Sequence, residues 1–406
     1  MLYDAYEVHR SWLAGASTLA NIGAGWMQNP ANPLAYSHMG PIVASALDVF
    51  AHASAPRGKP AFDLDTTRVD GRSVRVFEEV VLKKPFGQLK HFRRQGVKGG
   101  PRLLIVAPMS GHYATLLRGT VERMLPGHDV YITDWRDAKL VPLEEGRFDL
   151  DDYVDYLIEF LETIGPGAHM LAVCQPSVPA YAAAAVMSAD QNPCRPRTLT
   201  MMGGPIDTRK APTEVNTVAT QRPHSWFENN VIATVPYLYP GNGRKVYPGF
   251  LQLAGFMAMN LGNHLVSHWE MFRHLVQGDG ESAEATKDFY DEYRAVCDMT
   301  AEFYLQTVDV VFQRHLLPKG QLTHRGRRVD PSAITDVALL AIEGERDDIS
   351  GMGQTKAALD ISRALPARLK QYYLAEGVGH YGIFHGSKWR NRIAPAVEAW
   401  IAAHDG

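Results

Sequence analysis

Residues 169–187 read HMLAVCQPSVPAYAAAAVM, and this stretch decides the fold. Its first five residues form a nearly continuous apolar run, which is typical of a strand in a parallel sheet that is buried on both faces. Residues 181–187 are rich in alanine and predict a helix. Cys174 and Pro176 lie between them, so the stretch predicts a strand, a sharp turn and a helix.

A strand, a sharp turn and a helix form the setting of a nucleophile elbow, in which the turn residue projects from the end of the sheet. The free N–H groups of the helix N-terminus would stabilise a thiolate at Cys174. The backbone N–H of Gln175 would supply half of an oxyanion hole. The usual elbow motif is G-x-S-x-G, and Ala172 and Pro176 replace its glycines. Taken alone, this match leaves a buried structural cysteine as an open alternative.

Further predicted strands, before and after this stretch in the sequence, would form a sheet with it. Short, nearly continuous apolar runs predict strands at 102–108 and 129–134, and further strands fit 198–202, 336–342 and 367–374. Helical periodicity lies between them, most clearly at 150–164. Residues 73–94 alternate polar and apolar side chains and predict an antiparallel pair. Strands and helices that alternate over short connections predict an α/β fold with a mostly parallel sheet, here of the α/β-hydrolase type.

Two segments depart from this alternation. Residues 1–72 read as an N-terminal helical segment, apolar over residues 1–56. Residues 207–320 are rich in aromatics and methionine and predict a helical cap inserted into the core, with Cys297 on one of its helices. The α/β-hydrolase core then comprises residues 73–206 and 321–406.

An α/β hydrolase presents its catalytic residues in the chain order nucleophile, acid, histidine. Asp347 follows the expected strand at 336–342, where the acid belongs, and its neighbour Asp348 is the alternative. His380 stands in a glycine-rich loop after the last expected strand, where the base belongs. This order favours a triad of Cys174, Asp347 and His380, in which His380 takes the thiol proton and Asp347 orients the imidazole.

The second half of the oxyanion hole is expected in the loop after the strand at 102–108. The backbone N–H of Ser110, or that of its neighbour Met109, is the candidate donor. The methionine-rich and aromatic residues at 250–259 are expected to form the core of the cap or an apolar substrate groove.

Composition excludes several classes of protein. The chain has 406 residues, of which 46% are hydrophobic and 21% charged, and a net charge of −3. These values exclude a disordered chain and a coiled coil. Basic residues are not in excess, so the composition does not indicate a nucleic-acid partner. Three cysteines argue against a disulfide framework and for a reducing compartment. Asp4 and Glu7 stand where a signal peptide would be basic, and no apolar stretch is long enough to span a membrane, so we expect a cytoplasmic protein.

The sequence predicts neither a metal nor an organic cofactor. His264 and His268 are four residues apart, but no glutamate follows His264 and no third ligand is evident. Gly203 and Gly204 follow an expected strand, but the G-x-G-x-x-G spacing of dinucleotide sites is missing.

The chain resembles the intracellular poly(3-hydroxybutyrate) (PHB) depolymerases over nearly its full length. The residues that carry the resemblance are Met1-Leu-Tyr, the box AVCQPSVP at 172–179, Thr133-Asp-Trp with 150–154, residues 202–207, and the loops of Asp347 and His380. Related polyhydroxyalkanoate synthases also use a cysteine at such an elbow, but they usually keep glycines on both sides of it. Ala172 and Pro176 therefore favour the depolymerases.

The resemblance implies hydrolysis of a storage polyester in cytoplasmic granules through a 3-hydroxyacyl thioester on the enzyme. It implies the granule surface and 3-hydroxybutyrate oligomers as partners, with coenzyme A as an alternative acyl acceptor, and it leaves a homo-oligomer open. A synthase-like acyltransferase and a non-catalytic granule-binding protein are the alternatives.

Overall fold

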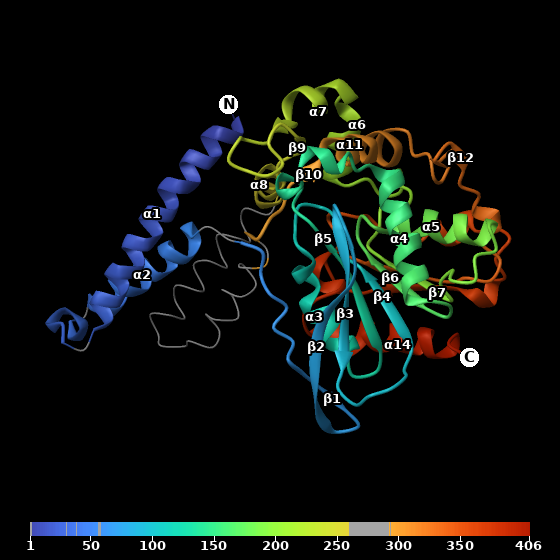
Figure 1. Ribbon diagram of the computed structural model, residues 1–406, viewed down its shortest axis with the longest axis horizontal. Helices are drawn as coiled ribbons and strands as arrows, with labels where there is room; N and C mark the ends of the chain where they lie inside the picture. The colour runs from blue at the N-terminus through green and yellow to red at the C-terminus, as the bar shows by residue number, and fades with distance from the viewer. Residues whose placement is uncertain (1, 30, 38, 56–57, 260–291, 293) are drawn as a thin grey trace.

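The computed structural model describes residues 2–29, 31–37, 39–55, 58–259, 292 and 294–406 (Figure 1). His264 and His268, which we weighed as metal ligands, lie outside these residues. Among the described residues, no three His, Cys, Asp or Glu side chains gather closely enough to hold a metal ion. No helix in the described part of the chain is both long enough and apolar enough to cross a membrane.

A nine-stranded sheet forms the centre of the molecule, in the order β1-β2-β3-β5-β4-β6-β7-β13-β14. Its strands are β1 (Thr66–Val69), β2 (Arg72–Lys84), β3 (Gly87–Arg94), β4 (Arg102–Val106), β5 (Asp129–Trp135), β6 (His169–Val173), β7 (Thr198–Met202), β13 (Ala338–Gly344) and β14 (Lys370–Ala375). From β5 to β14 all neighbours pair in parallel, whereas β1, β2 and β3 pair antiparallel. This is the strand order of an α/β hydrolase, as the sequence predicted.

Helices cover both faces of the sheet because successive strands are added first toward one edge of the sheet and then toward the other. The step from β4 to β5 runs toward one edge, and the steps from β5 to β6 and β7 run toward the other. Right-handed crossovers therefore place α3 (Arg118–Met124) on one face and α4 (Leu150–Ile164) with α5 (Ser177–Ala189) on the opposite face. The last helix, α14 (Ala394–Ala403), lies with α3, and Arg123 of α3 pairs with Glu398 of α14 at 2.6 Å.

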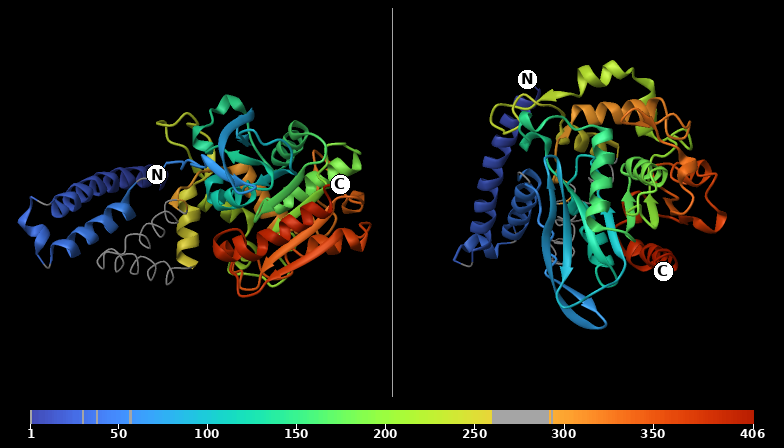
Figure 2. Two further views of the ribbon diagram at one scale, coloured as in Figure 1. Left: turned by 90° about the horizontal axis from the view of Figure 1, so that it is seen from below. Right: turned by 45° about the vertical axis from the view of Figure 1, so that its right-hand side comes forward.

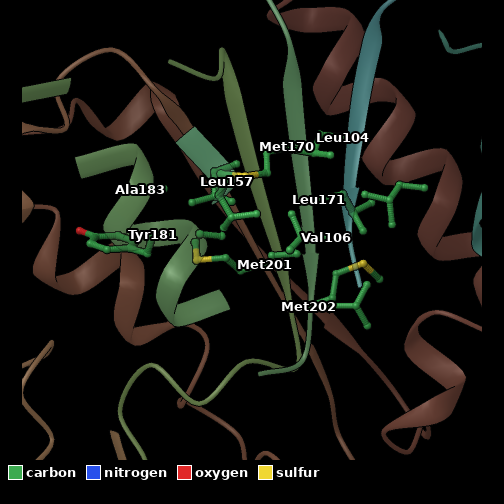
Figure 3. Packing of buried hydrophobic residues seen from close by; sticks show 14 of the residues in the cluster. Leu104, Val106, Leu157, Met170, Leu171, Tyr181, Ala183, Met201 and Met202 are labelled. Carbon is green, nitrogen blue, oxygen red and sulfur yellow. The ribbon is translucent and has the colours of Figure 1, made fainter. Parts of the chain in front are cut away.

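The core lies between the sheet and these helices. Figure 3 shows Leu104, Met170 and Met201 of three adjacent strands beside Leu157 of α4 and Tyr181 of α5. Every residue of β6, β7 and β13 is buried. This explains the nearly continuous apolar runs of β6 and β13, whereas β7 carries Thr198 and Thr200 among its apolar residues.

The insertion between β7 and β13 is more mixed than the helical cap that we expected for residues 207–320. Its described helices are α6 (Glu214–Gln221), α7 (His224–Asn230), α8 (Gly249–Met259) and α11 (Ala301–Thr307), which continues as a π-helical turn at Val308–Gln313. A small antiparallel sheet joins β8 (Ala233–Thr234), β9 (Lys245–Tyr247) and β10 (Met299–Thr300). These strands are too short to leave an alternating pattern in the sequence.

Smaller elements complete the described chain. They are β11 (Thr323–His324), β12 (Arg327–Arg328), α12 (Ala357–Ile361), α13 (Gly386–Lys388), a π-helical turn at Trp389–Ile393, and 3-10 turns at Pro33–Tyr36, Ala114–Leu117, Ala138–Leu140, Leu143–Glu145, Pro331–Ala333, Ala367–Leu369 and Tyr381–Ile383.

The N-terminal helical segment is shorter than the expected residues 1–72. It comprises α1 (Leu2–Gln28) and α2 (Gly40–Ser54), which lie side by side and project from the body (Figures 1 and 2). Strand β1 falls within the range that we expected to be helical. It turns back onto β2 through Asp70 and Gly71, both at positive φ, which is a common two-residue hairpin turn.

Candidate active site

Cys174 occupies a sharp turn between β6 and α5. Its φ is +66°, a left-handed conformation that costs a non-glycine residue about 1–3 kcal/mol. The turn is held on both sides: the Cys174 N–H donates to the carbonyl of Met202 at 2.7 Å, and the Cys174 carbonyl accepts from the Ser177 N–H at 3.0 Å. Backbone strain of this kind is typical of functional sites, since the surrounding structure must enforce it.

Gly204 lets the next strand approach this turn. A Cβ at Gly204 would lie 2.0 Å from Oγ of Ser177 and 3.1 Å from the carbonyl oxygen of Cys174. No side chain fits in that space, so glycine is required for the close contact between the end of β7 and the elbow.

His380 and Asp347 form a buried pair at the same end of the sheet. Nδ1 of His380 lies 2.8 Å from Oδ2 of Asp347. The other carboxylate oxygen, Oδ1, accepts the N–H of Ile349 at 2.9 Å and that of Ser350 at 2.7 Å. Asp348, the alternative acid, is exposed, and so the structure brings Asp347 and not its neighbour to the histidine.

The environment of His380 favours its protonated form. Burial by itself lowers the pKa of His380, but the charge and hydrogen bond of Asp347, together with those of the Cys174 sulfur, outweigh it. The net effect raises the pKa of His380 well above its ordinary value of 6.5. An imidazole of raised pKa is a stronger base toward a neighbouring thiol.

Gly203 lies against the histidine–aspartate pair. Its φ is +60°, and a Cβ there would lie 2.7 Å from Cδ1 of Ile383, 3.1 Å from Cε1 of His380 and 3.2 Å from Oδ2 of Asp347. We had discounted the Gly203-Gly204 pair because it lacks a dinucleotide-binding spacing. Its place behind the elbow and the pair depends on tertiary packing, which no local pattern in the sequence reveals.

Glu343 is a second residue that the sequence analysis did not single out. It is buried on β13 and accepts the backbone N–H groups of Gly353, Thr355 and Lys356 at 2.7–2.9 Å and the hydroxyl of Tyr372 at 2.8 Å. These bonds fix the loop that follows Asp347. Glutamate on a fully buried strand was the signal that could have identified it, because buried carboxylates need several donors.

The loop after β4 carries Met109 and Ser110, the two candidate oxyanion donors. Trp135 Nε1 and the Tyr153 hydroxyl both donate to the carbonyl of Ala107, at 2.8 and 3.2 Å, and so fix the start of this loop. Met109, Ser110, Cys174 and Gln175 line one common cavity. The structure thus brings the predicted oxyanion residues to the predicted nucleophile.

This catalytic cavity has a volume of about 630 Å³ and lies between the sheet and the insertion. Most of its described lining is apolar: Pro205, Val215, Val218, Ala219, Phe227, Tyr247, Met299, Phe303, Tyr304, Val308, Phe312 and Ile349. Glu214 is the one carboxylate among the described lining residues. Residues 250–259, expected to be cap core or groove, contribute Gln252 and Gly255.

Two polar side chains in the catalytic cavity have no hydrogen-bond partner among the described residues. They are the amide of Gln175 and the hydroxyl of Thr307, whose polar atoms are all buried. Buried polar groups are normally paired, so these two side chains are the exceptions among the described lining residues.

The other two cysteines are not brought to this site. Cys194 lies in the loop before β7, and the Cys297 thiol is fully buried, so that burial raises its pKa. We expected Cys297 to lie on a helix of the cap, but it lies outside any helix. Its N–H donates to the carbonyl of Gly111 at 2.8 Å, which holds this segment in an extended form beside the loop of Met109 and Ser110.

In a comparison with protein-family models, the family described as PHB de-polymerase C-terminus matches residues 203–405. No curated protein matches the chain.

Solved structures with similar folds are distant in sequence. DcsB in complex with its substrate analogue is 15% identical, with a TM-score of 0.46 over 82% of this chain and 99% of that chain. An esterase from Thermogutta terrifontis is 14% identical, with a TM-score of 0.41 over 84% and 98%. A monoacylglycerol lipase from Paleococcus ferrophilus is 11% identical, with a TM-score of 0.41 over 75% and 96%.

Proposed function

Because this chain belongs to the PHB depolymerase family and is an ester hydrolase by fold and family, we propose that it hydrolyses PHB through a thioester on Cys174. One observation carries the proposal: Cys174 sits at a strained turn in an apolar cavity, and its sulfur interacts with a histidine that is paired with a buried aspartate. Asp347 is the acid, His380 the base, and Met109, Ser110 and Gln175 surround the oxyanion.

The first step transfers the acyl group to the enzyme. His380 Nε2 takes the proton of the Cys174 thiol, and the sulfur attacks the ester carbonyl carbon. The carbon–oxygen bond of the ester then breaks, and the imidazolium returns the proton to the departing alkoxide. The products are a shortened chain with a free hydroxyl and a 3-hydroxyacyl thioester on Cys174. Asp347 keeps the imidazole in the tautomer that this transfer requires.

The second step releases the acyl group. His380 takes a proton from water, the resulting oxygen nucleophile attacks the thioester carbonyl, and the thiolate of Cys174 leaves and recovers the proton. Coenzyme A is the alternative acceptor, in which case its thiol replaces water and the product is a 3-hydroxyacyl thioester of coenzyme A. No cofactor enters either step.

The catalytic cavity suits the proposed substrate. PHB is an uncharged chain with a methyl branch and one ester carbonyl in each unit, so it needs an apolar surface with few polar contacts. Phe227, Phe303 and Tyr304 offer such a surface, and Gln175 and Thr307 offer donors to the carbonyls. The insertion would then act as a lid over the bound chain.

The site of action is proposed from the substrate. PHB forms granules in the cytoplasm, so the enzyme would work at the granule surface and on soluble 3-hydroxybutyrate oligomers, in the cytoplasm.

The test is an assay on amorphous PHB particles with and without coenzyme A, in which the products are identified by mass. We expect 3-hydroxybutyrate monomers and oligomers from the wild type and none from Cys174→Ala, with Cys194→Ala as the matched control that retains activity. Release that survives in Cys174→Ala would refute the mechanism. Polymer synthesis from 3-hydroxybutyryl-coenzyme A would favour an acyltransferase, and particle binding without any release would favour a non-catalytic binding protein.

A further inference from the structure

A stripe of large apolar side chains lies on the outside of α1. Val8, Trp12, Leu19, Ile22 and Trp26 are spaced by four, seven, three and four residues, so they share one face of the helix. All five are exposed, Trp12 to 77% and Trp26 to 55%. We name this set of five residues the arm face. Between Val8 and Trp26 it extends for about 27 Å along the helix axis.

The packing of α1 on α2 shows that the arm face is not the inner face of the hairpin. The buried residues between the two helices include four alanines, Ala20 and Ala24 of α1 and Ala44 and Ala51 of α2. Leu47 of α2 also lies there, against Gly23 of α1. The Ser17 hydroxyl donates to the carbonyl of Ala51 at 2.8 Å. A soluble helical hairpin normally places its large apolar residues inside. Here the alanines are inside and the tryptophans point outward, which marks an interaction surface.

The charge of the hairpin indicates the kind of partner. No Asp, Glu, Lys or Arg occurs between Arg10 and Asp48, in a chain of which 21% is charged. Helices that bind anionic lipid carry lysine and arginine beside their apolar face. A face without any charge complements a surface that is itself uncharged and apolar.

The base of α1 is anchored beside the catalytic cavity. The Tyr3 hydroxyl donates to Asp298 Oδ2 at 2.5 Å, and Asp298 Oδ1 accepts the N–H of Gly249, the first residue of α8. The ring of Tyr6 stacks on Phe250 of α8 with 3.8 Å between centroids. Since Gln252 of the same helix lines the cavity, α1 and the cavity wall share one support.

We propose that the arm face is the surface by which this protein docks on the uncharged polyester of the granule. The inference rests on the proposed function, because the polyester is the substrate proposed there. The base of α1 is fixed to the wall of the cavity. Docking through α1 would therefore hold the cavity close to the polymer chains. Tyr36 and Met39, between α1 and α2 in the sequence, are exposed as well.

The experiment compares the full-length wild type with the triple variant Trp12→Gln, Leu19→Gln, Ile22→Gln. Glutamine keeps the helix propensity at these exposed positions. The control triple variant, Val80→Gln, Leu143→Gln, Met352→Gln, removes three exposed apolar side chains from other surfaces. Each protein is measured for co-sedimentation with amorphous PHB particles, hydrolysis of a soluble 3-hydroxybutyrate trimer, binding to vesicles of phosphatidylcholine or phosphatidylglycerol, and mass in solution.

We expect the arm variant to bind particles more weakly than the wild type by at least roughly tenfold, because docking would bury the three side chains that it lacks. Binding by the wild type should not weaken as salt is raised, since no charge on the arm face takes part. The control variant should bind like the wild type, and all three proteins should hydrolyse the trimer equally.

Several results would overturn the proposal: unchanged particle binding by the arm variant, wild-type binding to either vesicle as tight as to PHB, or a wild-type dimer that the arm substitutions convert to a monomer. In each case intact trimer hydrolysis would leave the proposed function standing. A wild type that hydrolyses neither trimer nor particles would instead refute the proposed function.

Discussion

Asp347 accepts three hydrogen bonds, and only one of them comes from His380. Its Oδ2 lies 2.8 Å from His380 Nδ1, while its Oδ1 is held by the N–H groups of Ile349 and Ser350. The carboxylate is therefore fixed by backbone on one side and free to orient the imidazole on the other. This asymmetry separates a positioning aspartate from a surface carboxylate that happens to lie near a histidine.

Asp347→Asn should reduce kcat on a soluble 3-hydroxybutyrate trimer by about 10²–10⁴-fold, because the amide no longer stabilises the imidazolium or its tautomer. Asp348→Asn, at the exposed neighbouring position, should leave kcat within about twofold, as surface substitutions usually do. Steady-state kinetics on both variants measure this. Equal losses in the two variants would contradict the assignment of Asp347.

The pH dependence of the same reaction tests the environment of His380. Its raised pKa means that the proton leaves only above the ordinary value of 6.5, so kcat/KM should rise with pH and have its midpoint above 6.5. In Asp347→Asn the burial that lowers the pKa is no longer opposed by the carboxylate, and the midpoint should move below that of the wild type. A midpoint that stays in place would count against the pair.

Gly203→Ala should lower kcat by more than its loss of stability explains. A left-handed alanine costs about 1–2 kcal/mol wherever it stands, but only at Gly203 does the new Cβ press on His380 and Ile383. Gly71→Ala is the matched control, because Gly71 also has a positive φ and its Cβ would meet nothing within 4 Å. Thermal unfolding should show a larger loss of stability in Gly203→Ala, because the clash adds to the backbone cost that both variants share. At a temperature where both variants are folded, kcat should fall by more than roughly tenfold in Gly203→Ala alone. A fully active Gly203→Ala would show that the pair tolerates displacement.

The wall of the catalytic cavity can be tested at Val218, which lies on α6 and is half exposed. Val218→Asp places a charge where an apolar chain is proposed to bind, so KM for hydroxybutyrate oligomers should rise by about five- to tenfold with little change in kcat. Thr220→Asp adds the same charge to an exposed position of the same helix outside the cavity lining. If KM rises equally in both variants, the effect is one of general charge and the cavity is not the binding site.

The contribution of Asp298, which anchors α1, to the stability of the folded protein should depend on pH. Burial and the neighbouring Asp137 raise the pKa of Asp298 to about 6, so the folded protein holds this proton more tightly than the unfolded chain, in which the pKa is 3.8. This contribution to stability is full below pH 3.8 and is lost as pH rises through about 6. Asp298→Asn cannot ionise, so its stability relative to the wild type should increase between pH 4 and pH 7 in thermal unfolding. A constant difference over that range would contradict this account.

Much of the fold was predictable because its strands are buried on both faces. The strands at 169–173 and 198–202 and the helix at 150–164 were predicted with the bounds that the structure has. In contrast, β13 and β14 begin two and three residues later than predicted, and residues 367–369 form a 3-10 turn before β14. Strand β1 was missed because Thr66–Val69 has no buried residue and carries no apolar run.

Some residues of the candidate site could likewise be identified from the sequence, and others could not. Cys174, Asp347 and His380 could be named from the sequence because each follows a strand in a fixed chain order. Gly203 and Gly204 could not, since their roles arise from contacts between segments that are distant in the sequence. Glu343 was overlooked, although a glutamate within a buried strand was a usable signal. The choice between Asp347 and Asp348 likewise depends on which carboxylate the turn directs inward.

The central claim is that the polyester is cleaved through an acyl group on Cys174. Its most direct measurement is the intact mass of the protein after rapid acid quench during turnover of a 3-hydroxybutyrate trimer, followed by peptide mapping. The account predicts a hydroxybutyryl adduct on the peptide of Cys174, absent from Cys174→Ala. Turnover by the wild type with no adduct, or with the adduct on another residue, would contradict it.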